Sequence, residues 1–382
     1  MKILIAGDFC PQHRTKELFE KGEYATVFSE MTSVAKHNDY AIVNMECPVT
    51  YGIEQPIAKL GPNLQCSECG IEAVKWAGFH CVTLANNHFL DFGTQGVSNT
   101  LEVCRRFGID TVGGGENLSE ASAILYKKIE GKTLAIINCC ENEFSIATEK
   151  TAGSNPLNPI QQYYAIKEAR SKADYVLVIV HGGHEYYQLP SIRMQQTYRF
   201  FIDSGADSVV NHHQHCYSGY EIYHNKPIFY GLGNFCFDSI SQRKKIWYEG
   251  YLVQLEFSNA IAFKILPYIQ CKERPSVNML SPTVYDERIQ ELNSIIVDAD
   301  SLRNQQELYY SSSSKLYLNM FEPSNNRLYL ALKYRGLIPS FITTKRLLRA
   351  TNYILCEAHR DKLTYILSNH FSIPLSPPKR NK

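Results

Sequence analysis

The chain has 382 residues and a formal net charge of +1, from 39 Lys and Arg against 38 Asp and Glu, so its overall charge does not favour nucleic acid or an anionic membrane as a partner. With 44% hydrophobic and 20% charged residues, the composition is that of a protein that buries a core. Its apolar runs, such as residues 175–180, are far shorter than the roughly 18 residues of a membrane-spanning helix, and we expect no transmembrane segment.

The start of the chain and its cysteines favour a cytoplasmic protein. Residues 2–6 form a short apolar run close before Asp8, which fits a first strand better than a signal peptide. Several of the twelve cysteines lie in or beside apolar, strand-like stretches, where a reduced thiol acts as a small hydrophobic side chain. Cys66 and Cys69 form a lone C-x2-C pair, which we interpret as structural and not as a zinc or redox motif.

Short apolar runs alternate with segments of helical spacing over the first 270 or so residues, which is typical of α/β proteins. The predicted strands of this part are residues 2–6, 40–44, 81–84, 133–138, 175–180 and 208–211. Between them, helices are predicted at residues 67–78, 94–108, 159–172 and 191–205. A later group of strands is predicted at residues 219–223, 227–230, 251–257 and 261–266. The whole pattern predicts a mixed sheet or two sheets.

The pattern changes after Pro275, where helices are predicted at residues 284–297, 301–321 and 343–370. We therefore expect an α/β domain over residues 1–274 and a helical C-terminal extension over residues 275–382. Residues 331–382 carry ten Lys and Arg but only two acids, Glu357 and Asp361. We interpret these charges mainly as solvated helix faces, and docking of an acidic partner through the basic helices stays open.

Residue types that bind metals recur directly after the predicted strands. In chain order these residues are Asp8, Glu46, Asn87 with His88, His181 with Glu185, and His212, His213 and His215. Open α/β sheets build their sites at the carboxyl ends of the strands. A single acid or histidine at such a place is often a helix cap or a hydrogen-bonded loop residue. Five such groups at corresponding positions favour a common site.

Imidazoles and carboxylates together suit divalent Mn, Fe or Zn, and a bridging carboxylate can hold two cations about 3.5 to 4 Å apart. Asn87 offers a neutral oxygen ligand, while the neighbouring His88 stays free to donate a proton or to stabilise developing charge. His213 and His215 are one residue apart and can both turn toward the cluster, but spacing does not decide between His212 and His213. The sequence therefore predicts one or two divalent metal ions.

The motifs in these places resemble those of the capsule synthesis protein CapA (poly-γ-glutamate biosynthesis) family, a branch of the calcineurin-like metallophosphoesterases. The motifs are Gly7-Asp8, Asn44-x-Glu46, Asn86-Asn87-His88 followed by Asp91, His181-Gly-x-x-Glu185, His212-His213-x-His215 and Gly233-Asn234-Phe235. The resemblance spans residues 1 to about 240 and implies a four-layer α/β/β/α sandwich with a metal site at the sheet edge.

The resemblance also implies roles for individual residues. It implies metal ligands at Asp8, Glu46, Asn87, His181, His213 and His215. Glu46 takes the position of the bridging acid, His88 that of the catalytic histidine, and Asp91 orients His88. Asn234 is expected to support the metal loops by hydrogen bonding. Glu185, which follows the His181 turn, is a candidate to contact substrate or to act as an acid or base.

Three positions depart from the pattern of the superfamily. Cys10 stands where metallophosphoesterases usually have a histidine, Glu46 replaces the usual aspartate, and Asn211 replaces a glycine before the last histidine cluster. A single-metal site and a Cys10 ligand therefore stay open. The resemblance does not cover the segment after about residue 275.

The main hypothesis is a metal-dependent hydrolase in which water activated at the metal attacks a phosphoester or an amide or γ-glutamyl bond. The resemblance links it to capsule or anionic polymer (poly-γ-glutamate) biosynthesis, with an acidic polymer, a peptide or a phosphoester as substrate. Two alternatives stay open. One is a metal-dependent isomerase or epimerase acting at an α-carbon, and the other is a non-catalytic accessory protein of polymer biosynthesis.

Overall fold

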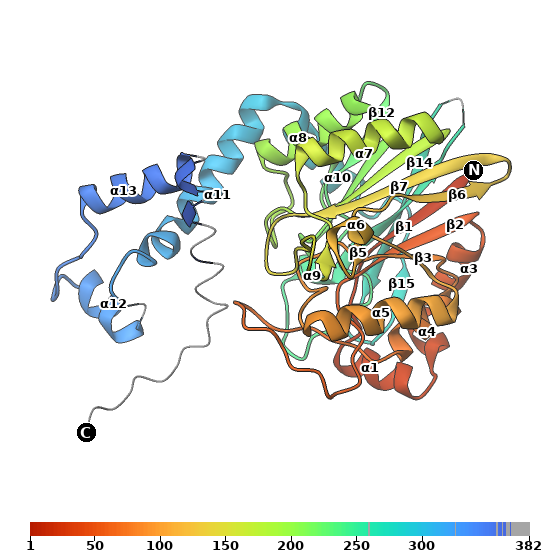
Figure 1. Cartoon of the computed structure of the whole chain (residues 1–382), viewed down its shortest axis with the longest axis horizontal. Coiled ribbons are helices and arrows are strands. Elements are labelled where there is room, and N and C mark those ends of the chain that lie inside the picture. Colours follow the sequence, from red (N-terminus) through yellow and green to blue (C-terminus); the bar gives the residue numbers. More distant parts are fainter. Residues whose placement is uncertain (259, 325, 357, 361, 364–366, 368–382) are drawn as a thin grey trace. The chain divides into compact units, whose positions relative to one another are not determined.

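The structure, a computed structural model, describes all residues except 259, 325, 357, 361, 364–366 and 368–382 (Figure 1). The chain divides into two compact units, residues 1–304 and residues 305–382. The first unit contains both large sheets and all the predicted site residues.

The larger sheet has seven strands in the order β15-β14-β13-β1-β2-β3-β4. Its parallel part consists of β1 (Lys2–Phe9), β2 (Tyr40–Met45), β3 (Cys81–Thr83) and β4 (Asp110–Val112). The antiparallel part consists of β13 (Glu249–Glu256), β14 (Ala262–Gln270) and β15 (Val277–Met279). Because the parallel strands run in one direction, their carboxyl ends meet at one edge of this sheet.

The smaller sheet has six strands in the order β11-β12-β10-β9-β7-β6. Its parallel strands are β7 (Lys132–Cys140), β9 (Tyr175–His181), β10 (Ser208–His212) and β12 (Lys226–Phe229). The edge strands β6 (Leu125–Ile129) and β11 (Tyr220–Tyr223) pair antiparallel. A two-stranded sheet joins β5 (Gly114–Gly115) to β8 (Gly153–Ser154). Of the two arrangements that the sequence allowed, the structure has two sheets.

The alternation of side chains along β1 shows how the layers pack. Ile3 and Ile5 face a core shared with the smaller sheet, whereas Leu4 and Ala6 face a second core on the other side. This second core contains residues of α1 (His13–Glu20), α2 (Tyr24–Phe28), α3 (Met31–Lys36), α4 (Cys69–Ala77) and α5 (Gly93–Phe107). On the smaller sheet, α7 (Pro159–Lys172) and α8 (Ile192–Ser204) form the opposite outer layer (Figure 1). The predicted four-layer α/β/β/α sandwich is confirmed.

Helix α10 (Asp286–Val297) lies beyond the predicted domain boundary at residue 274 but packs on the first unit. Leu292 and Ile296 are buried in the core between the sheets and their helices. The side chain of Asn293 accepts a hydrogen bond from the backbone N–H of Tyr220 at 2.7 Å. The first compact unit therefore extends past the predicted boundary, because helical periodicity shows that a helix forms but not which surface it covers. The predicted division into a family domain over residues 1–274 and a helical extension over residues 275–382 stays a prediction.

The second unit contains all or part of the helices α11 (Ala299–Asn319), α12 (Arg327–Tyr334) and α13 (Thr344–Leu355). The predicted helix over residues 343–370 is interrupted at Cys356, whose backbone is extended, and its last predicted residues lie outside the described part of the chain. Two short helices, α6 (Leu118–Ala121) and α9 (Lys245–Tyr248), complete the first unit. Among the described residues, no helix combines the length and the apolar character that crossing a bilayer requires.

Candidate metal centre

The predicted ligands gather where the strands of both sheets end. Asp8 lies near the end of β1, Glu46 follows β2, and His181 ends β9. Asn87 follows β3, and the pair His213 and His215 follows β10. All six side chains belong to buried residues, as Asp8, Glu46, Asn87, His181, His213 and His215 are each at most 9% exposed. The structure thus brings together residues that are up to some two hundred positions apart in the sequence.

Two groups of ligand atoms share one residue. Glu46, His181 and His213 form the first group, and Asp8, Glu46 and His215 form the second, with the ligand atoms of each group within 4.8 Å of one another. The Oε1 atom of Glu46 lies 3.7 Å from His181 Nε2 and 3.5 Å from His215 Nε2. A carboxylate between two imidazoles from separate groups has the placement of a bridging acid.

The electrostatics of Glu46 fit a bound cation. Its side chain is fully buried, and neither carboxylate oxygen has a hydrogen-bond partner among the described residues. Burial raises the pKa of Glu46 well above its ordinary value, and the nearby charge of Asp8 raises it further. An unpaired buried carboxylate is unfavourable, and a metal ion would supply the positive partner that no described residue supplies through a hydrogen bond.

The imidazoles are suited to act as ligands because their surroundings favour the neutral form. Burial lowers the pKa of His181 well below its ordinary value, and the neighbouring His213 lowers it further. Burial also lowers the pKa of His215 to about 4, although the charge of Asp8 opposes the shift. Metals bind the neutral imidazole, so these histidines are ready to bind at neutral pH. The donor set therefore fits one or two divalent ions.

Asn87 and Asp8 are held next to the two groups by specific contacts. Asn87 Oδ1 lies 3.1 Å from His181 Nε2, within reach of the first group. Asn44 Nδ2 donates to Asp8 Oδ1 at 2.8 Å, and the backbone N–H of His213 donates to Asp8 Oδ2 at 3.2 Å. These hydrogen bonds fix the Asp8 carboxylate, and Asn44 is a supporting residue that its place in the Asn44-x-Glu46 motif could have indicated.

The loop after β10 adopts unusual backbone conformations that turn its histidines inward. His213 has a φ of 92° and His215 a φ of 53°, values that residues other than glycine rarely adopt. Asn234 Oδ1 lies 2.9 Å from His215 Nδ1 and so orients the ring, as expected for a supporting residue. His212 instead has Nε2 2.9 Å from the carbonyl oxygen of Ala6. The geometry therefore places His213, and not His212, in the ligand group.

Cys10 directly follows β1, two residues after Asp8. Its side chain is buried in the core that packs against helices α1 to α5. Gln12 Nε2 donates to Cys10 Sγ at 3.2 Å. Neither ligand group found among the described residues includes Cys10. The geometry thus gives no support to a Cys10 ligand, while the two groups leave room for a second metal without it.

His88 and Asp91 lie beside the ligand groups as a hydrogen-bonded pair. His88 Nδ1 is 2.6 Å from Asp91 Oδ2, and the backbone N–H of His88 donates to Asn86 Oδ1 at 3.0 Å. The Asp91 side chain is fully buried. Lys59 also reaches this pair, with Nζ 3.0 Å from His88 Nδ1. Sequence reasoning missed Lys59, because it lies in an irregular segment that carries no motif.

Glu185 differs from the other predicted residues in being exposed, and neither ligand group contains it. Its charge nevertheless acts on the site: burial chiefly lowers the pKa of His213, and Glu185 opposes this shift. Aromatic side chains surround His215, and sequence reasoning missed two of them, Phe237 and Trp247. The rings of Phe237 and Trp247 lie 5.5 and 5.3 Å from its ring centre, and that of Tyr186 lies at 6.1 Å. They form an aromatic wall on one side of the second group.

The chain is thus an α/β/β/α sandwich in which acids and imidazoles gather at the strand ends as a candidate metal centre. The family described as "Bacterial capsule synthesis protein PGA_cap" matches residues 2–239 of this sequence. The match covers more than half of the chain, and the chain belongs to this family. The resemblance on which the site was predicted is therefore confirmed.

Named relatives agree with this assignment. The "Capsule biosynthesis protein CapA" of Bacillus anthracis is 32% identical over 253 residues, covering 64% of this chain and 62% of that protein. The "PGA biosynthesis protein CapA" of Bacillus subtilis is 34% identical over 237 residues, covering 61% of this chain and 62% of that protein. The chain thus spans about three-fifths of the length of these relatives.

Solved structures show weaker similarity. A hypothetical protein from Thermus thermophilus has a TM-score of 0.46 and 15% identity, covering 70% of this chain and 99% of that one. A protein described as a novel phosphatase, from Mycoplasma pneumoniae, has a TM-score of 0.43 and 15% identity, covering 72% of this chain and 95% of that one. The family assignment accordingly rests on the sequence match.

Proposed function

We propose that the chain is a metal-dependent hydrolase that cleaves a phosphoester or an amide or γ-glutamyl bond during capsule or poly-γ-glutamate biosynthesis. The observation that carries the proposal is Glu46, a fully buried carboxylate between two histidines with no hydrogen-bond partner among the described residues. The family and the relatives named for capsule and PGA biosynthesis support the pathway. The proposed substrate is an acidic polymer, a peptide or a phosphoester.

Six residues would hold the metal in this proposal. They are Asp8, Glu46, Asn87, His181, His213 and His215, and the proposed ions are one or two of Mn, Fe or Zn. A divalent ion bound there would polarise the scissile group and lower the pKa of a water molecule. Asn44 and Asn234 keep Asp8 and His215 in place through their hydrogen bonds.

The protein's own residues then position and transfer protons. Asp91 holds His88 through Nδ1. Nε2 of the ring is then left to donate a proton to the leaving group. Glu185, exposed at the end of β9, contacts the substrate or accepts a proton. The aromatic wall of Tyr186, Phe237 and Trp247 excludes water from one side of the site.

The test uses the full chain loaded with Mn²⁺, Fe²⁺ or Zn²⁺ and two chromogenic probes, bis(p-nitrophenyl) phosphate and γ-glutamyl-p-nitroanilide. We expect metal-dependent cleavage of at least one probe, loss of turnover in His88→Ala, and unchanged turnover in His224→Ala. His224 is an exposed histidine paired with Asp203 and serves as the matched control. Metal-loaded protein that cleaves neither probe, or His88→Ala with full turnover, contradicts the hydrolase. Deuterium incorporation from solvent at an α-carbon without cleavage identifies the isomerase or epimerase instead.

A non-catalytic accessory role is the second candidate, and the observation that favours it is that neither ligand group among the described residues includes Cys10, which stands at the place of the usual histidine. A relative in Mycobacterium tuberculosis carries the name "Probable polyglutamine synthesis accessory protein". Unchanged polymer production by a cell that carries only His88→Ala supports the accessory role. Loss of production with that variant supports the enzyme.

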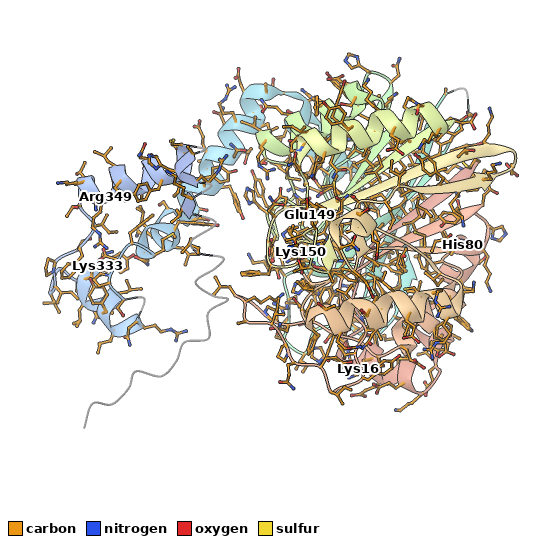
Figure 2. The ribbon with its side chains drawn as sticks, in the orientation of Figure 1. Lys16, His80, Glu149, Lys150, Lys333 and Arg349 are labelled. Atoms are coloured by element: carbon orange, nitrogen blue, oxygen red, sulfur yellow. The ribbon has the colours of Figure 1, made fainter. Side chains whose placement is uncertain are left out.

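The cellular placement is also part of the proposal. All twelve cysteines are free, which fits a reducing compartment and hence the cytoplasm. In the second unit, Lys333 of α12 and Arg349 of α13 belong to the basic surface proposed to dock an acidic partner (Figure 2). Lys333 already pairs with Glu322 at 2.9 Å, so the basic residues of α13 carry this part of the proposal.

A further inference from the structure

Lys59 is buried in a way that is unusual for lysine. Its side chain is 2% exposed, whereas the next residue, Leu60, is 84% exposed. Both lie in the irregular segment of residues 51–64, between β2 and α4. Lysine is among the residue types least often buried, and burying its ammonium carries a large desolvation cost. The segment thus turns its charged residue inward and an apolar one outward, the reverse of the usual preference.

The buried ammonium meets the Asp91–His88 pair. Lys59 Nζ forms an ion pair with Asp91 Oδ1 and lies 3.0 Å from His88 Nδ1. The other oxygen of Asp91, Oδ2, lies 2.6 Å from His88 Nδ1 and accepts a hydrogen bond of 2.6 Å from the backbone N–H of Leu64. One oxygen of the carboxylate is therefore paired with the ammonium and the other is hydrogen-bonded, and the carboxylate cannot rotate without losing one of these contacts.

Further hydrogen bonds fasten the segment to Asp91. The carbonyl oxygen of Asp91 accepts from the backbone N–H of Ile57 at 2.9 Å and from Asn63 Nδ2 at 2.9 Å. Asn63 Nδ2 also donates to the carbonyl oxygen of Ile57 at 3.1 Å, which closes the segment around Lys59. Contacts on both sides of Lys59 thus lead back to the same acid, so the segment places the ammonium with little freedom.

We propose that Lys59 is a positioning residue of the site: its ammonium fixes the Asp91 carboxylate, and Asp91 in turn fixes the His88 ring. An ionised carboxylate can only accept, so the 2.6 Å contact from Nδ1 to Oδ2 places the ring proton between His88 and Asp91. The 3.0 Å approach of the Lys59 ammonium to Nδ1 is then a contact between two donors and not a hydrogen bond, and the ammonium acts on the ring through Asp91. Nε2 has no hydrogen bond to a described residue, so it is the ring nitrogen left for proton transfer. The inference rests on the proposed role of His88 in hydrolysis.

A purely structural ion pair makes a different prediction. If the ion pair were purely structural, its removal would lower the stability of the fold. The geometry of His88 would stay unchanged in any variant that folds. A readout of the hydrogen bond between His88 and Asp91 therefore separates the two. A proton held between an imidazole Nδ1 and a carboxylate over a short distance resonates far downfield of the amide protons.

The test records this resonance by ¹H–¹⁵N NMR in the full chain with ¹⁵N-labelled histidine, without substrate. Asp91→Asn assigns the resonance by abolishing or shifting it. We expect the resonance in wild type, its loss or shift in Lys59→Met, and its return in Lys59→Arg, which restores the charge. Lys226→Met is the matched control, because Lys226 pairs with Asp207 at 3.2 Å in the same unit but outside the site, and it should leave the resonance unchanged.

Several results would overturn the proposal. They are the absence of the resonance from wild type, an unchanged resonance in Lys59→Met, and equal losses in Lys59→Met and Lys226→Met. If Lys59→Met does not fold, Lys59→Gln keeps a donor for Asp91 without the charge and should shift the resonance. An unshifted resonance in folded Lys59→Gln also overturns the proposal.

Turnover of bis(p-nitrophenyl) phosphate provides a second arm. If Lys59→Met misplaces the proton-transferring ring of His88, kcat should fall at least about tenfold with KM and metal content unchanged. Lys59→Arg should recover most of the lost kcat. An unchanged kcat in Lys59→Met overturns the proposal. If wild type cleaves no probe, the hydrolase proposal fails, while the NMR arm still decides whether Lys59 positions His88.

Discussion

Replacing Glu46 by glutamine removes one negative charge from the centre of the site while nearly keeping the size of the side chain. In metal-free protein, the buried carboxylate has no hydrogen-bond partner among the described residues and lies near Asp8. An unsatisfied buried polar group costs about 1–3 kcal/mol, and a charged one costs more. Glutamine keeps a polar group in this place but removes the charge, so we expect Glu46→Gln to stabilise the metal-free protein by about 1–3 kcal/mol at a pH where Glu46 is ionised, which corresponds to a rise in Tm of roughly 2 to 5 °C for a unit of this size.

The pH dependence of this gain has a definite sign. Burial raises the pKa of Glu46, so the folded state keeps its proton at pH values where the unfolded chain has released it. The metal-free wild type therefore loses stability as the pH rises above 4.5, the ordinary value for glutamate, toward the raised folded-state pKa. Glutamine does not titrate. The stability difference in favour of Glu46→Gln should thus be larger at pH 8 than at pH 5.

Metal should reverse the order of the two proteins. A ligand present at 100 times its Kd stabilises the folded state by about 2.7 kcal/mol. Wild type should gain this stabilisation, whereas Glu46→Gln loses the ligand shared by both groups and should gain much less. Thermal unfolding with EDTA and with Mn²⁺ or Zn²⁺ measures both orders. Glu149→Gln is the control at an exposed glutamate (Figure 2), with an expected change within about 0.5 kcal/mol in either condition.

Two results would refute this reasoning. One is a wild type more stable than Glu46→Gln in EDTA, which would mean that the buried carboxylate has a favourable partner in the metal-free protein. The other is an equal metal-induced rise in Tm for both proteins, which would mean that Glu46 is not a ligand.

Four other variants test separate parts of the site and fold. His88→Ala should keep the metal content of wild type but lower turnover by about 10²- to 10⁴-fold, and loss of metal would show that His88 is a ligand. His181→Ala should lower the metal content measured by mass spectrometry, so full occupancy would remove it from the ligands. Cys10→Ser should leave that content unchanged, and a decrease would make Cys10 a ligand. Leu292→Ala should destabilise the first unit by about 2–5 kcal/mol in denaturant unfolding, whereas a negligible effect would contradict the packing of α10.

The sequence was sufficient to predict which side chains gather at the candidate metal centre, because each follows a strand. Asp8, Glu46 and His181 come directly at or after apolar runs whose parallel pairing brings their ends together. The resemblance to a family then supplied roles, such as the bridging place of Glu46, that strand patterns alone do not give. Spacing could not choose between His212 and His213, because the choice depends on the positive φ of His213.

The rest of the site depends on contacts that leave no local pattern. Lys59 lies in an irregular segment, and its burial follows from hydrogen bonds to Asp91, some thirty positions further along the chain. Trp247 joins the site from a short helix after β12, far along the chain from its partner His215. The packing of α10 on the first unit could not be predicted for the same reason, since the apolar face of α10 does not tell which surface covers it.

The most direct measurement is anomalous X-ray diffraction from crystals of the full chain prepared with Mn²⁺ or Zn²⁺. We expect one or two anomalous peaks at ligand distance from Glu46, with His181 and His213 on one side and Asp8 and His215 on the other. Protein that takes up no metal, or peaks bound only by residues outside these two groups, would contradict the metal centre on which the proposed hydrolase depends.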